Sequence, residues 1–351
     1  MKTSRAVLIA VALAGLALLL VWGGPRRAGA VVVYTSVDAE YAQPVARRFE
    51  ELTGIPVVLR TDSEVSKTTG MLGRLRQLKD HPDGDVFWNS ELSGTLLLAA
   101  EGVFAPYRSP QAELIPAQFR DPGGNWTGFG LRARVLIYNT QHVKPDEAPK
   151  TLEELTDARW RGRFCVARPL FGTTRSHLVS LVLALGEERA FDLLRRLREN
   201  GSAGGARKWI VDGNAAARDR VVEGYFHLGL TDTDDVYSAQ ARGAPVAMVF
   251  LEQTRDWPGV YLIPNAVALI NRGPNPEAGR AFIDFLLRPE TEEWLAQQLA
   301  RQIPVREGIS VPQGSPRLSG LRAAGVDYAA LTARLEPLSE RIDRLLSGLE
   351  P

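Results

Sequence analysis

The chain has 351 residues, 45% of them hydrophobic and 24% charged, a composition typical of a globular protein of about two domains that excludes disordered and collagen-like chains. Four of its 42 basic residues and none of its 41 acidic residues lie in the first thirty positions, so the remainder carries 38 bases and a net charge of −3. This charge balance gives no reason to expect a nucleic-acid partner.

The first thirty residues have the pattern of an export signal. A short basic start precedes an apolar run from Ala6 to Trp22, and Ala28-Gly29-Ala30 has the small-x-small form that signal peptidase accepts. We therefore predict that residues 1–30 are a signal peptide and that the protein is periplasmic. The alternative is an uncleaved anchor, because a spanning helix needs roughly 17 to 25 apolar residues. In both cases the folded part is expected outside the cytoplasm.

From Val31 onward, short apolar runs alternate with amphipathic helices, the pattern of a parallel sheet covered by helices. Strands are predicted at 31–36, 55–60 and 85–88. The first strand is followed by a helix that ends before Gly54. Four apolar residues share one face of that helix: Tyr41, Val45, Phe49 and Leu52. Further helices are predicted at about 64–79 and from 91 onward.

A second α/β series follows a long predicted strand over 128–138. Strands are predicted in it at 163–167, 226–230 and 245–250. A helix is predicted at about 174–185, followed by another helix to about 198. A further long strand is predicted at 260–270. Asn275-Pro276-Glu277 and Pro289-Glu290 are typical helix starts, and a terminal helix is predicted over 328–349.

The two series are not separated by a linker rich in Pro, Gly or Ser, so the long strands near 130 and 260 are predicted to cross between two lobes. The expected fold class is α/β, with a hinge of crossover strands and a cleft between the lobes. Lobe 1 is predicted to comprise 31–134 and 258–300, and lobe 2 to comprise 135–257 and 301–351.

Ligands of such sheets bind at the carboxyl ends of strands, where loops run into helix N-termini. The polar residues at these turns are therefore candidate ligand contacts: Ser36, Asp38, Ser63, Asn89, Ser90, Gly172, Thr173, Thr174, Asn214 and Thr233. Most of these residue types are also preferred helix N-caps, so each one taken singly is consistent with capping. The run Gly172-Thr173-Thr174 has a more specific interpretation, because a glycine and two hydroxyls at a helix start let N–H groups close on an oxyanion.

The stretch LTDTDDVY, residues 230–237, places three carboxylates within four residues. Two like charges about 4 Å apart cost on the order of 1 kcal/mol in water and about 4 kcal/mol at an effective dielectric of 20. A position in a cleft would therefore raise the pKa of one carboxyl group or require a cation, and hard cations prefer such oxygen ligands. The alternative is that Asp234 or Asp235 caps the following helix.

Motifs of known enzyme classes are absent from the sequence. The four histidines form no HExxH pair, and GxSxG, CxxC and GxGxxG do not occur. The only cysteine, Cys165, lies in an apolar strand-like run, which excludes a disulfide framework and a cysteine-based metal cluster. We therefore do not expect an enzyme. A secreted metal-dependent enzyme is the alternative from another class, and it would need a nucleophile or general base with an orienting partner.

Several segments together resemble one family, the periplasmic solute-binding proteins of ABC importers, and specifically its ferric-iron-binding type. They are VVVYTSVDAEYAQPVARRFEELTGIPV, DVFWNSE, WTGFGLRARVLIYNT, PLFGTT, DGNAAARDRVVEG and LIPNAVALINRGPNPEAGRAFIDFLL. The resemblance implies a type II periplasmic binding protein fold that closes on its ligand and delivers it to an ABC permease in the inner membrane. It also implies a monomer that binds a metal ion or small molecule and has no cofactor beyond a possible Fe³⁺ ligand with its synergistic anion.

The resemblance also implies a set of metal ligands. In iron-binding members, a histidine or acid after the first strand, a glutamate after the third and two adjacent tyrosines in the second lobe coordinate the metal. Here Asp38 stands at the first position, and the glutamate position falls on Ser90, with Glu91 next to it. Asp234 and Asp235 stand at the positions of the two tyrosines. The implied metal ligands are therefore Asp38, Glu91, Asp234 and Asp235.

The anion site of the family matches other residues of this chain. A helix N-terminus and nearby polar groups hold a synergistic phosphate or carbonate in the family, and these positions match Gly172, Thr173 and Asn214. Arg132 or Arg134 on the crossover strand would complete the site.

Two ligand classes fit these positions. The first is ferric iron held by carboxylates. The second is a phosphonate or aminophosphonate, whose phosphonate group would bind the GTT turn and an arginine while the aspartates take the ammonium group. Three carboxylates argue against a bare anion, whereas the missing tyrosines argue against iron, so the sequence leaves both classes open.

Overall fold

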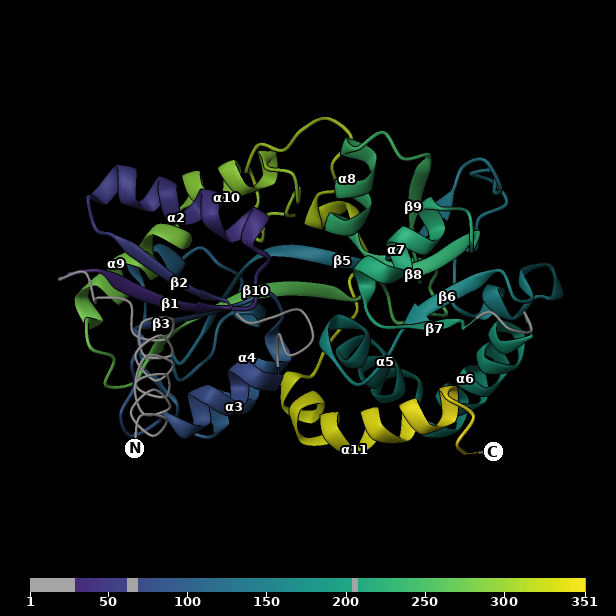
Figure 1. Ribbon diagram of the computed structural model, residues 1–351, viewed down its shortest axis with the longest axis horizontal. Helices are drawn as coiled ribbons and strands as arrows, with labels where there is room; N and C mark the ends of the chain where they lie inside the picture. Colours follow the sequence, from purple (N-terminus) through teal and green to yellow (C-terminus); the bar gives the residue numbers. More distant parts are fainter. Residues whose placement is uncertain (1–28, 62–68, 204–207, 351) are drawn as a thin grey trace, which may run out of the picture.

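Two α/β lobes lie side by side in the computed structural model and are joined by the long strand β5 (Thr127–Asn139), with β10 (Leu262–Ile270) beside it (Figure 1). The structure describes residues 29–61, 69–203 and 208–350. Most of the predicted signal peptide and the candidate Ser63 lie outside these ranges. Among the described residues, no helix has the length and hydropathy needed to cross a bilayer.

The first lobe contains a mixed sheet of parallel and antiparallel strands. Its other strands are β1 (Val31–Thr35), β2 (Val57–Thr61), β3 (Val86–Asn89) and the short β4 (Phe104–Ala105). β1 lies between β2 and β3 and is parallel to both, whereas β10 runs antiparallel to β3. The helices are α2 (Ala39–Thr53), α3 (Thr69–Gln77), α4 (Leu92–Ala100), α9 (Pro276–Leu286) and α10 (Pro289–Gln297).

Helix α2 illustrates how the sequence pattern produces these elements. Val45 and Phe49 are buried on its inner face, and Gly54 ends it in the left-handed conformation with φ 71°. Glycine adopts this conformation without a steric penalty, so the predicted helix end is confirmed.

The second lobe is built on β5, β8 (Leu228–Asp232) and β6 (Phe164–Ala167), with β7 (Ile210–Val211) at one edge and β9 (Val246–Phe250) also paired to β5. β8 lies between β5 and β6, antiparallel to the first and parallel to the second. Its helices are α5 (Gly172–Leu185), α6 (Glu187–Ser202), α7 (Asn214–Val222), α8 (Thr233–Ala241) and α11 (Tyr328–Leu346).

The change from one lobe to the other occurs within β5. Ala133 pairs with Leu262 of β10, and the next residue, Arg134, pairs with Asp232 of β8. The core of the first lobe includes Ala133, and that of the second begins at Val135. We therefore assign the hinge to this point of β5.

Two later segments also connect the lobes. Ile303 and Val305 pack in the core of the first lobe, although the sequence-based division assigned residues from 301 onward to the second. Helix α11 packs along α5 and α6 of the second lobe, as Figure 1 shows, and also contacts α4 of the first. At its start, the ring of Tyr328 lies 6.4 Å from that of Trp126.

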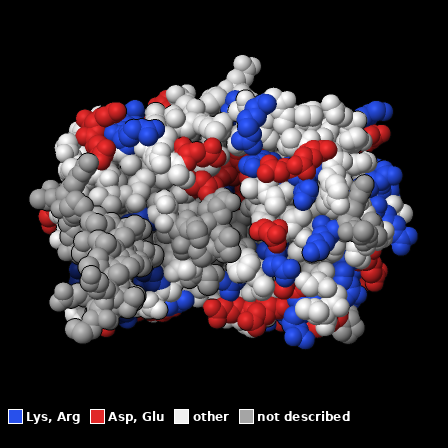
Figure 2. Space-filling model, viewed as in Figure 1, with Lys and Arg blue, Asp and Glu red and all other residues white. Residues whose placement is uncertain are grey.

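The strand order brings the polar turns of both lobes together. β1 and β3 end at Thr35 and Asn89 in the first lobe, and β8 ends at Asp232 in the second. Acidic side chains are visible at the boundary between the lobes, near α2 and α8 (Figure 2). This boundary is where a ligand of such a sheet is expected.

Candidate functional site

A pocket of about 350 Å³ lies between the lobes at these strand ends. The turn after β1 and the first residues of α2 form its wall on one side, and residues of α7 and α8 form the other. Its charged lining consists of four carboxylates and one guanidinium: Asp38, Glu40, Asp234, Asp235 and Arg218. Because both lobes contribute carboxylates, the pocket favours a cationic ligand. A cation bound there would interact with both lobes at once.

The two carboxylate oxygens of Asp234 differ in their contacts. Its Oδ2 accepts a hydrogen bond from Arg132 Nη1 at 3.2 Å, whereas its buried Oδ1 has no hydrogen-bond partner in the described part of the chain. Burial raises the pKa of Asp234, the Arg132 guanidinium opposes this rise, and the Asp232 carboxylate adds to it. A cation in the pocket would supply the missing interaction.

Asp235 is held by two donors. Arg218 Nη1 donates to its Oδ1 at 3.2 Å, and the Thr231 hydroxyl donates to its Oδ2 at 2.6 Å. Burial raises the pKa of Asp235 to about 7, and the neighbouring carboxylates of Asp234 and Asp232 add to the rise. This carboxyl group therefore changes its charge near neutral pH.

We expect the ligand-free protein to lose stability as the pH rises from about 4 to above 7. The pKa of Asp235 is about 7 in the folded protein and near 3.8 ordinarily, so the folded state holds the extra proton within that window. The resulting stability is present at low pH and is lost as the pH rises through about 7. Thermal melts of the wild type and Asp235→Asn across this range measure the effect, because the amide does not titrate. A constant difference between the two proteins would contradict the shift.

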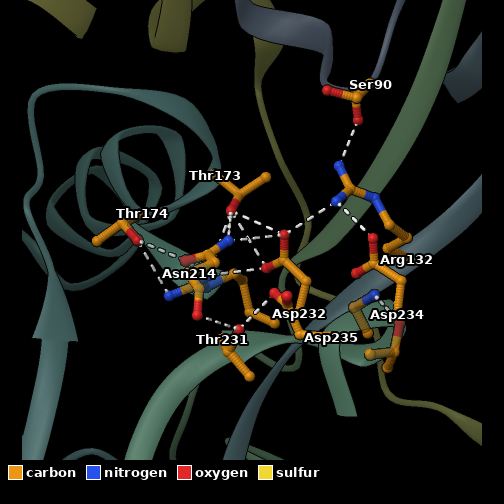
Figure 3. Close-up of polar contacts among 12 residues, drawn as sticks. Ser90, Arg132, Thr173, Thr174, Asn214, Thr231, Asp232, Asp234 and Asp235 are labelled. Carbon is orange, nitrogen blue, oxygen red and sulfur yellow. Dashed lines mark hydrogen bonds and ion pairs between the residues drawn. The ribbon is translucent and has the colours of Figure 1, made fainter. Parts of the chain in front are cut away.

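The Asp232 carboxylate is fully buried and lies at the centre of a polar network (Figure 3). Arg134 Nη1 donates to its Oδ1 at 2.8 Å, and Arg132 Nη1 donates to its Oδ2 at 3.1 Å. The Thr173 hydroxyl lies 2.9 Å and Asn214 Nδ2 lies 3.0 Å from the same Oδ2. The residues predicted to bind an anion are thus brought together, and the chain's own carboxylate lies among them.

Arg134 is held in this network on several sides. It is 1% exposed, and its guanidinium donates to Asn214 Oδ1 at 3.0 Å. It also donates to the hydroxyls of Thr173 and Thr174, each at 3.2 Å. The buried charge of Arg134 therefore has an ion-pair partner and several hydrogen-bond acceptors.

Ser36, Asn89 and Ser90 connect the ends of β1 and β3. The Ser36 hydroxyl donates to Asn89 Oδ1 at 2.6 Å and accepts a hydrogen bond from Ser90 N at 2.9 Å. The Ser90 carbonyl accepts a hydrogen bond from Arg132 Nη2 at 2.5 Å. Arg132 therefore links the turn after β3 in the first lobe to Asp232 and Asp234 in the second.

Glu91 lies elsewhere, although the resemblance implied that it is a metal ligand. Its Oε2 accepts a hydrogen bond from Ser93 N at 2.8 Å, and its Oε1 accepts one from Gly94 N at 3.0 Å, so Glu91 caps α4. It lines a separate pocket of about 60 Å³ together with Gly172. Both carboxylate oxygens of Glu91 thus bond to the start of α4, and Glu91 is not among the residues that line the pocket with Asp38 and Asp234.

Two further candidates have mainly local contacts. Gly172 begins α5 with φ 54°, in the left-handed region that favours glycine. Thr233 is fully buried, and its hydroxyl accepts a hydrogen bond from Ala133 N at 3.3 Å. Thr233 therefore holds α8 against the hinge strand.

Sequence reasoning missed Glu40, Tyr41 and Arg218 of the pocket lining and the role of Asp232. Arg218 follows Asn214 by four residues on α7, so helical periodicity would have placed it on the same face. Glu40 and Tyr41 lie in the first turn of the helix that follows Asp38. Asp232 ends the preceding strand, β8, and the sequence pattern does not show that it lies opposite Arg134.

This chain is similar to known proteins over most of its length. Residues 96–330 match the bacterial extracellular solute-binding protein family. The iron uptake protein A1 of Synechocystis sp. is 28% identical over 282 residues, which cover 79% of this chain and 76% of that protein.

Solved structures of other proteins have the same fold as this chain. Iron-bound HitA from Pseudomonas aeruginosa matches with a TM-score of 0.78 at 21% identity, over 89% of this chain and 99% of that one. AfuA from Actinobacillus pleuropneumoniae, solved with fructose-6-phosphate bound, matches with a TM-score of 0.75 at 19% identity, over 91% of this chain and 99% of that one. These likenesses confirm the predicted α/β periplasmic binding protein fold.

Proposed function

The chain belongs to the bacterial extracellular solute-binding proteins, and we propose that within this family it is the ferric-iron-binding component of an ABC importer. As a solute-binding protein it is not an enzyme. It acts outside the cytoplasm, where it binds a small ligand and delivers it to a membrane permease.

The observation that carries the proposal is the convergence of carboxylates from both lobes on one pocket, together with an oxygen of Asp234 that has no hydrogen-bond partner among the described residues. Fe³⁺ is a hard cation that prefers carboxylate, phenolate and water oxygens. The carboxylates of Asp232, Asp234 and Asp235 have oxygens within 4.8 Å of one another, which is close enough for one ion to be shared. Asp232 is fully buried and is not among the residues that line the pocket, whereas Asp234 and Asp235 line it, so these two are the proposed ligands in this lobe.

The first lobe would supply the opposing ligand. Asp38 lines the same pocket, and Glu40, the second residue of α2, lines it as well. We propose Asp38 as the ligand from this lobe and Glu40 as the acid that takes the place expected for Glu91. An ion bound between these groups would favour the closed arrangement, because only closure brings both sets of carboxylates to it. Proteins similar to this chain include an iron uptake protein of Synechocystis sp. and iron-bound HitA from Pseudomonas aeruginosa, which supports this ligand.

A zwitterionic organic ligand is the second candidate. A volume of about 350 Å³ lies within the usual range of roughly 300 to 1,000 Å³ for small-molecule sites. Arg218 pairs with Asp235 and lines the pocket together with Asp38, so the pocket offers both signs of charge. The expected phosphonate site at Thr173 and Asn214 holds Asp232 instead, however, so an aminophosphonate would have to use Arg218 for its anionic end.

Thermal melting of metal-free protein comprising residues 31–351 tests these alternatives. Ferric citrate, Ca²⁺, Mg²⁺, phosphate and 2-aminoethylphosphonate would be added separately, with citrate alone as the control. A ligand at a hundred times its dissociation constant adds about 2.7 kcal/mol of stability, and we expect this from ferric iron. A shift with 2-aminoethylphosphonate and none with ferric iron would overturn the proposal.

A further inference from the structure

The network around Asp232 has the composition of an anion-binding site whose donors come from three different elements. Arg132 and Arg134 belong to β5, Thr173 to the first turn of α5 and Asn214 to the first residue of α7. All four donate to one carboxylate, at distances between 2.8 and 3.1 Å. Figure 3 shows the side chains of the two helix starts pointing at Asp232 from one side and Arg132 reaching it from the other.

The donors require an anion at this position. Arg134 is 1% exposed and the side chain of Arg132 is 12% exposed. The two arginines are two positions apart on β5. Buried like charges are stable only when a counter-charge and hydrogen-bond acceptors compensate their desolvation. Asp232 pairs with Arg134 across the sheet, so the fold itself places the compensating carboxylate there.

Asp232 also shares with Asp234 the hydrogen bond that Arg132 Nη1 donates. Arg132 Nη1 is shared between Asp232 Oδ2 at 3.1 Å and Asp234 Oδ2 at 3.2 Å. Without the charge on Asp232, Arg132 would have Asp234 as its main partner and would compete with any cation for that carboxylate. With Asp232 in place, Asp234 Oδ1 keeps no partner among the described residues.

We propose that Asp232 is a tethered anion, a positioning residue whose carboxylate occupies a site built for a free oxyanion, so that the protein binds its cation without a second, co-bound anion. The part that concerns the cation rests on the proposed function, whereas the occupied anion site does not. It follows that removing the carboxylate should create a site for an exogenous anion of the same size.

Chemical rescue of Asp232→Ala tests this inference, because the substitution removes one carboxylate group and formate is that group as a free ion. In chloride buffer we expect the variant to melt on the order of 5 °C below the wild type, because two buried guanidinium groups lose their counter-charge. Sodium formate should restore most of the melting temperature, and sodium chloride at equal ionic strength should not. Ferric iron should bind at least tenfold more weakly to the variant without formate and recover with it.

Matched variants separate space from charge. Asp232→Asn removes the charge but fills the same volume, so formate should not rescue it. Asp232→Ser leaves most of the space and should be rescued like Asp232→Ala. The inference is overturned if formate and chloride act alike on the two truncated variants, if formate rescues Asp232→Asn equally, or if neither truncated variant folds even in formate.

The two proposals fail in different ways in this experiment. Rescue of the melting temperature by formate in the absence of any metal supports the tethered anion whatever the cargo is. If that rescue occurs but the wild type gives no response to ferric iron, the proposed function is wrong and the anion site stands. If the wild type binds iron and formate does not raise the melting temperature of the truncated variants, the proposed function stands and the tethered anion is wrong.

Discussion

We expect Asp234→Asn to bind ferric iron at least 100-fold more weakly than the wild type, a loss of about 2.7 kcal/mol in binding free energy. The substitution keeps the shape of the side chain and removes its charge. In the wild type, Asp234 lines the pocket, and its Oδ1 has no hydrogen-bond partner among the described residues, whereas its Oδ2 is shared with Arg132. A unit charge about 4 Å away contributes about 4 kcal/mol at an effective dielectric of 20, which is enough for the expected loss. Titration of each protein with ferric citrate, followed by tryptophan fluorescence, measures the change.

Glu91→Gln is the matched control for this experiment. It also neutralises an acid that the sequence assigned to the metal, but Glu91 caps α4 and lines a different pocket. We expect iron binding to be unchanged and the stability to fall by about 1 kcal/mol, the usual effect of weakening an N-cap. Equal losses of iron affinity in Asp234→Asn and Glu91→Gln would contradict the assignment of the site to the pocket lined by Asp38 and Asp234.

The largest expected effect on stability is that of Arg134→Met, a decrease of about 3 to 5 kcal/mol in the free energy of unfolding. Methionine fills a similar volume but leaves the buried Asp232 carboxylate without its 2.8 Å ion-pair partner. It also removes the donor to Asn214 and to the two threonine hydroxyls. Urea unfolding followed by circular dichroism gives the difference.

Arg196→Met provides the comparison for Arg134→Met. Arg196 lies in the same lobe and pairs with Asp192 and Glu153, but its side chain is 41% exposed. Exposed pairs contribute roughly 0 to 1 kcal/mol, so this variant should be close to the wild type. Similar losses in the two variants would show that burial of the Arg134 pair does not matter for the fold.

Most of the fold could be predicted from the sequence because its signals are local. Apolar runs and helical periodicity locate the strands and helices, and Gly54 and Pro276 mark a helix end and a helix start. The packing of Ile303 and Val305 on the first lobe was not predictable in the same way. A short segment without periodicity contains no information about which of two cores it will join.

The candidate site was predicted less completely, for a physical reason. The sequence locates the turns at strand ends, but it does not determine which way a side chain points within a turn. Glu91 and Asp38 occupy similar turns, yet Glu91 faces its own helix N-terminus while Asp38 lines the pocket. Asp232 and Asp234 are two residues apart, and only the register of β8 with β5 shows that the first of them faces Arg134.

Equilibrium dialysis against ferric citrate tests the central claim most directly, namely that carboxylates of both lobes form a site for ferric iron. We expect metal-free protein comprising residues 31–351 to retain one iron per chain in buffer without phosphate or carbonate, as measured by elemental analysis. Asp38→Asn in the first lobe and Asp234→Asn in the second should each lose it. Wild-type protein that retains no more iron than these two variants would contradict the claim.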